Sequence, residues 1–253
     1  MTYTDRFSAL TSWLDSTHGG QAFTVQPASE DASFRRYFRI GLGKTTYIAM
    51  DAPPQLEDCE SFVRIDRLLE ANHLHVPHIY AADLSLGFIL LSDLGKTAYL
   101  DKLNTDTVDR LYGDALDALF IMQTSVPHGT LPPYDEALLN REMSLFREWF
   151  LQTHLALKLD IEAENILAET FGLLTENALA QPKVFVHRDF HSRNLMITDS
   201  NNPGILDFQD AVSGPIAYDL VSLLRDCYIA WPDSRVYAWV ADYHARLVRH
   251  GLL

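Results

Sequence analysis

Hydrophobic positions change their spacing near residue 93, and the change predicts two kinds of structure along the chain. Before that point, apolar residues at helical spacing predict helices over 4–16 and 58–72. The short β-prone runs in the same part, each bounded by turn residues, lie at 23–25, 37–40, 45–50, 79–80 and 87–91. The first three of these strands follow one another closely enough to form an antiparallel meander.

After Gly95 the helical spacing dominates. Long amphipathic stretches lie at 104–124, 135–157 and 160–180, and further helices begin near residue 216. A β pattern returns in three short runs, at 184–186, 195–197 and 205–207. We therefore predict an α+β protein of two lobes with a cleft, a small antiparallel β lobe over 1–93 and a mainly helical lobe over 94–253.

Composition narrows the class of protein. Of the 253 residues, 47% are hydrophobic and 21% are charged, which is typical of a globular protein and not of a disordered or collagen-like one. The formal net charge of −14 argues against nucleic acid and anionic membranes as partners. Two cysteines without a CxxC pair, no signal peptide and no long apolar run predict a cytoplasmic protein.

The residues that carry chemistry are concentrated in 184–211. An apolar run ends in the tripeptide HRD, whose aspartate is Asp189, and Asn194 follows five residues later. The last apolar run ends in Asp207 after a turn rich in Asp, Asn, Pro and Gly. If the last two runs pair as a hairpin, Asn194 and Asp207 offer an amide oxygen and a carboxylate to one point, and such hard oxygen ligands suit Mg²⁺.

The order of these residues matches that of phosphoryl-transfer enzymes, HRDxxxxN followed by an Asp-Phe pair. We predict that Asp189 accepts a hydroxyl proton and that Asn194 and Asp207 hold the metal and, through it, the nucleotide. His187 is predicted to hold the loop by hydrogen bonds without touching substrate. An ordinary surface turn is the alternative for the whole segment.

This segment, HRDFHSRNLM, resembles the aminoglycoside phosphotransferase and choline kinase superfamily, small-molecule relatives of the protein kinases. His191 stands where protein kinases have a lysine, and only eleven residues separate Asp207 from Asp219, too few for a segment that docks protein substrates. The resemblance implies a two-lobed protein-kinase-like fold, ATP as phosphoryl donor, and a structural role for Asp219, which would brace the catalytic loop.

Further motifs are similar to those of the bacterial cell-wall sugar kinases, which phosphorylate the anomeric hydroxyl of N-acetylmuramate and N-acetylglucosamine in peptidoglycan recycling. These motifs are ASFRRYFRI (32–40), MDAPP (50–54), SLFREWF (144–150) and DFQDAVSGPIAYDLVSLLRDCYI (207–229). The resemblance implies a monomer that binds ATP, Mg²⁺ and a small sugar. Members of that family extend past the position of Leu253, so a shortened C-terminus is also expected.

The nucleotide side departs from the kinase pattern. The loop between the first two strands has no glycine, and we predict that the backbone at Ser33 and Phe34 approaches the phosphates. Met50 stands where kinases have a lysine, so we predict that Arg39 replaces it, with Arg35 and Arg36 as alternatives. The predicted adenine contacts are backbone groups of the linker, at Ser92 and Leu94.

The sugar requires polar groups and an aromatic face. Glu142 and Trp149 lie seven residues apart, on one face of a predicted helix. A solvated helix face is the alternative for Glu142 and core packing the alternative for Trp149. The other predicted sugar contacts are Asp210, which emerges from the metal loop, and Asp226 and Tyr228.

Three other functions compete with a sugar kinase. A hydrolase would use His187, Asp189 and His191 as ligands of a transition metal. A nucleotide-binding module without turnover would explain the absent lysine and the loop without glycine. An aminoglycoside or choline kinase would take a cationic acceptor, which suits the acidic charge.

Overall fold

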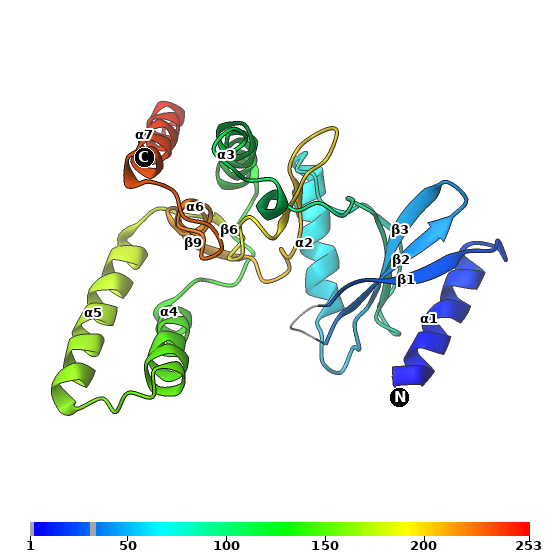
Figure 1. Ribbon diagram of the computed structural model, residues 1–253, viewed down its shortest axis with the longest axis horizontal. Helices are drawn as coiled ribbons and strands as arrows, with labels where there is room; N and C mark the ends of the chain where they lie inside the picture. The colour runs from blue at the N-terminus through cyan, green and yellow to red at the C-terminus, as the bar shows by residue number, and fades with distance from the viewer. Residues whose placement is uncertain (1–2, 31–33) are drawn as a thin grey trace. The chain divides into compact units, whose positions relative to one another are not determined.

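The computed structural model describes residues 3–30 and 34–253 (Figure 1). The chain divides into two compact units. One comprises Met1–Ala115 with Arg193–Asp210, and the other Leu116–Ser192 with Ala211–Leu253. The two predicted lobes, 1–93 and 94–253, remain a prediction. In the observed division, the segment 193–210 groups with the N-terminal part of the chain.

The first unit contains a five-stranded antiparallel sheet with the order β1-β2-β3-β5-β4. Its strands are β1 (Thr24–Glu30), β2 (Arg36–Leu42), β3 (Thr45–Asp51), β4 (Ile79–Asp83) and β5 (Phe88–Ser92). The predicted meander is therefore confirmed as β1-β2-β3, and the two later runs are confirmed as β4 and β5. Strand β5 is almost entirely buried, and it pairs with β3 on one side and β4 on the other.

Two helices pack on opposite sides of this sheet (Figure 1). On α1 (Tyr3–Thr17), Leu10 and Leu14 are fully buried in one cluster with Phe38 of β2 and Leu90 of β5. Helix α2 (Cys59–Ala71) begins where the side chain of Asp58 accepts a hydrogen bond from the N–H of Ser61, which satisfies a free amide of the first turn. Its buried face includes the apolar side chains Phe62, Ile65 and Leu69.

The predicted metal hairpin also belongs to the first unit. Strand β7 (Leu195–Met196) pairs antiparallel with β8 (Gly204–Ile205). The intervening turn is anchored by Asn202, whose amide nitrogen donates to Tyr99 Oη at 2.6 Å and Asp114 Oδ2 at 2.7 Å. Tyr99 lies in the short helix η1 (Tyr99–Asp101), and Asp114 lies in α3 (Val108–Ser125). The hairpin is therefore fixed at its tip as well as by its strands.

The second unit contains a two-stranded sheet and most of the helices. Strand β6 (Lys183–Val186) pairs antiparallel with β9 (Val212–Pro215). The sequence pattern predicted β6 but not β9. The remaining helices are α4 (Glu136–Leu145), the π-helix η2 (Phe146–His154), α5 (Ile161–Ala180), α6 (Tyr218–Leu224) and α7 (Asp233–His250). The single helix predicted over 135–157 is thus α4 followed by a π-helical run. Among the helices in the described part of the chain, none has the length and apolar character needed to cross a membrane.

Candidate active site

The hairpin brings Asn194 and Asp207 together. Asn194 lies immediately before β7, and Asp207 follows two residues after β8. The N–H of Leu206 donates to the carbonyl of Asn194 at 2.9 Å, which extends the pairing beyond the strands. The amide nitrogen of Asn194 donates to Asp207 Oδ2 at 3.2 Å. The juxtaposition expected from the apolar runs is present, and the two side chains share one end of the hairpin.

Asp207 is held in an unusual backbone conformation. Its φ of 65° is in the left-handed region, which residues other than glycine seldom adopt. The next residue, Phe208, is buried, and its ring centroid lies 5.0 Å from that of Phe62 on α2. Ser61 Oγ donates to the carbonyl of Gln209 at 3.0 Å. Packing and hydrogen bonding on both sides therefore keep the strained residue in place.

The chemistry of this pair fits Mg²⁺. Asp207 offers a carboxylate, and Asn194 offers an amide oxygen when its side-chain amide is flipped, an exchange that conserves its shape. Gln209 Nε2 donates to Asp207 Oδ1 at 2.9 Å and orients the carboxylate from the other side. Because Mg²⁺ keeps several waters and substrate oxygens, two protein ligands are sufficient for it.

The loop after β6 lies in the second unit, and its first two residues are bonded to a buried carboxylate on α6. The backbone N–H groups of His187 and Arg188 donate to Asp219 at 2.7 and 3.0 Å. Asp219 is fully buried on α6, and this burial raises its pKa to about 7 against the opposing effect of the two N–H groups. His187 is also buried, and its Nδ1 accepts from the N–H of Asp189 at 3.2 Å. Asp219 and His187 therefore hold the backbone of the loop by hydrogen bonds.

Asp189 follows on the same loop. Its carbonyl accepts from the N–H of His191 at 3.0 Å, and its side chain is partly exposed. It belongs to the second unit, whereas Asn194 and Asp207 belong to the first. The catalytic role of Asp189 remains a prediction.

The other end of this loop is held by Asp226, which was predicted to bind sugar. Asp226 is buried, and its two oxygens accept from the N–H groups of Ser192 and Tyr228, each at 2.9 Å. This carboxylate therefore braces the loop, a role that the sequence prediction missed. The ring of Tyr228 is 45% exposed and lies edge-on to His191, with 5.5 Å between the ring centroids. Tyr228 remains a candidate for contact with the acceptor.

Glu142 and Trp149 have quite different surroundings. Glu142, on α4, accepts hydrogen bonds from Arg188, Tyr134 and Tyr218, so the alternative of a solvated helix face is wrong. Trp149 is 64% exposed, so the alternative of core packing is wrong for it. The change from an α-helix to a π-helix at Phe146 alters the spacing that placed the two residues on one face. Their predicted contacts with sugar are not tested by these positions.

Three further predicted site residues are Asp210, Ser33 and Phe34. Asp210 is exposed, three residues after Asp207, and its Oδ2 accepts from Gln209 Nε2 at 3.4 Å. Ser33 lies outside the described residues. The N–H of Phe34 donates to Glu57 Oε1 at 3.0 Å, and the ring of Phe34 is 63% exposed.

The arginines predicted for phosphate binding all have carboxylate partners. Arg39 Nε donates to Asp93 Oδ2 at 2.6 Å, and another of its nitrogens donates to the carbonyl of Gly95 at 2.8 Å. The hydrogen bond with Asp93 is the main reason that the pKa of Arg39 is raised. Arg36, like Arg6, pairs with the buried Asp51.

The register of the sheet distinguishes Arg36 from Arg39. Arg36 is the first residue of β2 and lies opposite Asp51, next to the loop predicted to approach the phosphates. Arg39 lies opposite Ile48 and is bonded to the linker after β5. The contacts therefore give Arg39 a structural partner at the linker. They favour Arg36, one of the two alternatives that the sequence left open, over Arg39 as the cation nearer the loop.

The linker itself offers few free backbone groups at Ser92. The N–H of Ser92 donates to the carbonyl of His78, and its Oγ accepts from the N–H of His78, both at 2.9 Å. A β-carbon on Gly204 would lie 2.9 Å from Leu94 Cδ1, so Leu94 packs closely on the hairpin. Adenine binding at Ser92 and Leu94 remains a prediction.

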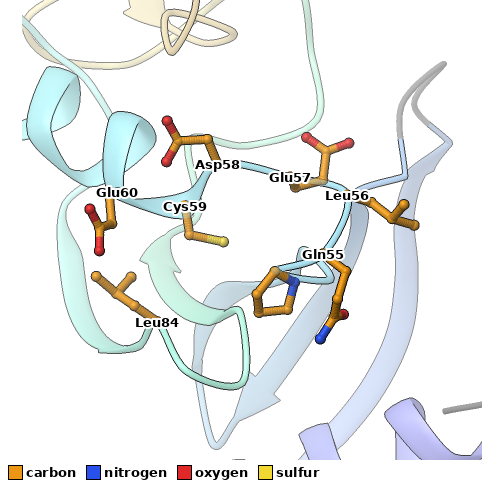
Figure 2. Close-up of a pocket in the computed structure, with 8 residues that line it drawn as sticks. Gln55, Leu56, Glu57, Asp58, Cys59, Glu60 and Leu84 are labelled. Carbon is orange, nitrogen blue, oxygen red and sulfur yellow. The ribbon is translucent and has the colours of Figure 1, made fainter.

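A cavity of about 430 Å³ opens at the N-terminus of α2 (Figure 2). Its lining residues are Pro54, Gln55, Leu56, Glu57, Asp58, Cys59, Glu60 and Leu84. None of the predicted site residues is among them. Glu57 is already engaged by Arg35 at 2.9 Å and by the N–H of Phe34. This opening was not predictable from the sequence, because its walls come from one loop and from a turn more than twenty residues further along the chain.

Within the described residues, no group of three or more His, Cys, Asp or Glu side chains is arranged to hold a metal ion. The hydrolase alternative required such a group at His187, Asp189 and His191. Instead, His187 is buried against its own loop and His191 packs beside Tyr228. The cluster of metal ligands that the hydrolase alternative requires is therefore not found among the described residues.

Comparison with known proteins agrees with this geometry. The sequence model of the phosphotransferase enzyme family matches residues 24–252. The chain belongs to this family. The predicted resemblance is therefore confirmed, and the chain is a phosphotransferase.

Several curated relatives carry the name N-acetylmuramate/N-acetylglucosamine kinase. The Pseudomonas aeruginosa protein is 45% identical over 258 residues, which cover 98% of this chain and 76% of the relative. The Pseudomonas putida protein is 46% identical over 257 residues, with the same two coverages. The Neisseria meningitidis protein is 38% identical over 96% of this chain and 73% of the relative.

Solved structures confirm the predicted fold class. Choline kinase LicA from Streptococcus pneumoniae superposes with a TM-score of 0.67 at 12% identity, over 93% of this phosphotransferase and 80% of that chain. The ADP-bound aminoglycoside phosphotransferase APH(2'')-Ib gives a TM-score of 0.64 at 15% identity, over 94% and 82% of the two chains. At these identities the likeness establishes a shared α+β kinase-like fold.

Proposed function

We propose that this phosphotransferase transfers the γ-phosphoryl group of ATP to the anomeric C1 hydroxyl of N-acetylmuramate or N-acetylglucosamine. The juxtaposition of Asn194 and Asp207 on one hairpin carries the proposal, because it gives the nucleotide phosphates a metal-binding pair. The names of the relatives that are 38–46% identical support the acceptor. The ADP-bound aminoglycoside phosphotransferase supports ATP as the donor.

Asn194 and Asp207 would hold Mg²⁺. When bound there, Mg²⁺ supplies positive charge to the phosphate oxygens, which helps an acidic chain to hold an anionic nucleotide. Gln209 keeps the Asp207 carboxylate oriented before the metal arrives.

Asp189 acts as the base. Its carboxylate accepts the proton of the C1 hydroxyl while the sugar oxygen forms a bond to the γ-phosphorus. The bond between that phosphorus and the bridging oxygen breaks, and ADP leaves with the electron pair. Positioning and charge supply most of the catalysis in such transfers, so the supports of the Asp189 loop matter as much as the base itself.

An ADP-release assay with Mg-ATP tests donor and acceptor together. The acceptors are N-acetylmuramate, N-acetylglucosamine, choline and kanamycin, with a reaction lacking acceptor as the blank. We expect release with the two N-acetyl sugars only. Turnover of choline or kanamycin alone would show that the acceptor is not an N-acetyl sugar. ATP binding without release of ADP for any acceptor would contradict the proposal.

The site of transfer needs its own control. The methyl glycoside of N-acetylglucosamine keeps every hydroxyl except the anomeric one, so we expect no ADP release with it. Coupling between the product phosphorus and the C1 proton in an NMR spectrum should identify the anomeric phosphate. Phosphorylation of the methyl glycoside would place transfer at another hydroxyl.

A further inference from the structure

Arg188, the residue before the predicted base, is in a strained conformation. Its φ of 79° is in the left-handed region, where a side chain larger than hydrogen is disfavoured. Such a conformation persists only when several contacts enforce it. One contact is the hydrogen bond from its N–H to Asp219, and it acts on the backbone alone. The orientation of Arg188 sets the direction in which the chain enters Asp189.

The side chain of Arg188 supplies a second restraint. Its guanidinium donates to Glu142 of α4 and lies over the ring of Tyr134, with Cζ 6.0 Å from the ring centroid. Both members of the ion pair are mostly buried, with 22% and 23% of their side chains exposed. At this burial an ion pair resists solvent screening better than one on the surface, and losing one partner leaves a poorly solvated charge.

Glu142 is in turn fixed by two tyrosines. The hydroxyl groups of Tyr134 and Tyr218 each donate a hydrogen bond to Glu142 Oε2, and that of Tyr218 does so at 3.2 Å. Burial raises the pKa of Tyr218 to about 12 and also raises that of Tyr134, so both remain protonated donors at neutral pH. Both carboxylate oxygens of Glu142 therefore have protein partners.

The tyrosines connect this cluster to the sheet and to α6. The N–H of Tyr134 donates to the carbonyl of Ser213 on β9 at 2.8 Å. A β-carbon on Gly214 would lie 2.8 Å from Tyr134 Cβ, so the strand and the tyrosine are in close contact. Tyr218 begins α6 and precedes Asp219, which holds the backbone of the same loop. The cluster thus joins α4, β9 and α6 at one residue of the loop.

We infer that Glu142 and Arg188 form a positioning pair for the Asp189 loop, and that Glu142 acts through Arg188 and not on the sugar. The inference rests on the proposed role of Asp189 as base. The pair holds the backbone of Arg188 in its strained conformation, so the carboxylate that follows is presented in one orientation. Misplacement of a reacting group by about 1 Å costs about 100-fold in rate, which is the scale expected here.

Kinetics of Glu142→Gln, Arg188→Ala and the double variant test the pair. We expect kcat to fall by about 10- to 100-fold in each, with the KM values of sugar and ATP within about twofold of the native values. Because the two residues act as a unit, the double variant should lose no more than the worse single variant. Arg188→Lys, which keeps the charge without the planar fork, should lose less than Arg188→Ala.

A second ion pair in the same unit provides the matched control. Arg147 and Glu164 form a two-bond pair, at 2.8 and 2.6 Å, between η2 and α5. Glu164→Gln removes the same charge from a helix and should leave kcat unchanged. A Glu142→Gln kcat equal to that of Glu164→Gln would overturn the inference. A raised sugar KM with native kcat would also overturn it, because it would indicate that Glu142 contacts the acceptor.

A readout without turnover separates this inference from the proposed function. Amide hydrogen exchange over residues 187–192 needs neither ATP nor sugar, and we expect Glu142→Gln or Arg188→Lys to accelerate it while Glu164→Gln does not. Unchanged exchange in a folded variant would contradict the positioning pair whatever the acceptor is. Failure of the native chain to phosphorylate either sugar would instead count against the proposed function.

Discussion

At the scale of single residues, Asp189 gives the sharpest prediction. Asp189→Asn keeps the size of the side chain but removes its ability to accept a proton, so we expect kcat to fall by about 1,000-fold. ATP affinity should stay within about twofold, since the predicted metal ligands are elsewhere on the chain. Steady-state kinetics and an ATP titration measure the two effects. Asp199→Asn, an exposed residue of the hairpin turn, is the control. Native turnover in Asp189→Asn would show that Asp189 is not the base.

Two arginines of β2 give a second prediction at this scale. Arg36 begins the strand beside the predicted phosphate loop, whereas Arg39 is bonded to Asp93 and Gly95. We therefore expect Arg36→Ala to weaken ATP binding by about tenfold or more, the scale of a lost charge-assisted contact. Arg39→Ala should lower the melting temperature with a smaller effect on ATP.

Calorimetric titration with ATP and a melting curve for each variant check this order. Arg36→Lys keeps a positive charge opposite Asp51 and serves as the conservative control. If Arg39→Ala weakens ATP binding more than Arg36→Ala does, the phosphate cation is Arg39, as the sequence pattern alone predicted.

At the scale of elements, the prediction concerns the binding of Mg²⁺ by the β7–β8 hairpin. Asp207→Asn removes the only charged ligand of the proposed pair, so the Mg²⁺ concentration for half-maximal activity should rise by about tenfold or more. A chelator should stop ADP release by the native enzyme, and added Mg²⁺ should restore it. Activity of Asp207→Asn at the native Mg²⁺ requirement would show that the hairpin holds no metal.

The same hairpin shows what local sequence can predict. Its apolar runs, its turn residues and the positions of Asn194 and Asp207 are all within fourteen consecutive residues, and that spacing alone placed the two side chains together. The five strands of the large sheet were predictable for the same reason, because each is set by short-range alternation and turn chemistry.

Other features were not predictable because their partners are far along the chain. Glu142 meets Arg188 46 residues later, and Asp226 meets Ser192 34 residues earlier. Nothing in a helical spacing distinguishes such a carboxylate from a solvated one. Strand β9 was missed because it exists by pairing with β6, and it contains a glycine and a proline. The bond between Arg39 and Asp93 was not predictable either, because the two residues are 54 positions apart in the sequence.

At the scale of the whole molecule, an acid-rich chain must place its carboxylates where they can stay charged, and Asp66 is an exception. It lies on α2 with its side chain fully buried, and neither of its oxygens has a hydrogen-bond partner. Burial, with Glu70 nearby, raises its pKa from 3.8 to about 7, against the weaker opposing effects of His78 and Arg67.

This exception predicts how the stability of the enzyme changes with pH. Between about pH 4 and 7 the native state keeps the Asp66 proton, whereas the unfolded chain has lost it. The native state then binds more protons, so the contribution of Asp66 to the free energy of unfolding falls as pH rises through this range. Asp66→Asn stays neutral and lacks this loss.

Urea unfolding at pH 5 and pH 8, followed by tryptophan fluorescence, measures the difference. Relative to the native chain, Asp66→Asn should gain at least about 1 kcal/mol in free energy of unfolding between the two pH values. Other titrating groups are common to both proteins and cancel in the comparison. Asp106→Asn, which changes an exposed residue, should show no such gain. Parallel pH profiles for native and Asp66→Asn would mean that Asp66 is ionised in the folded protein and paired with a cation.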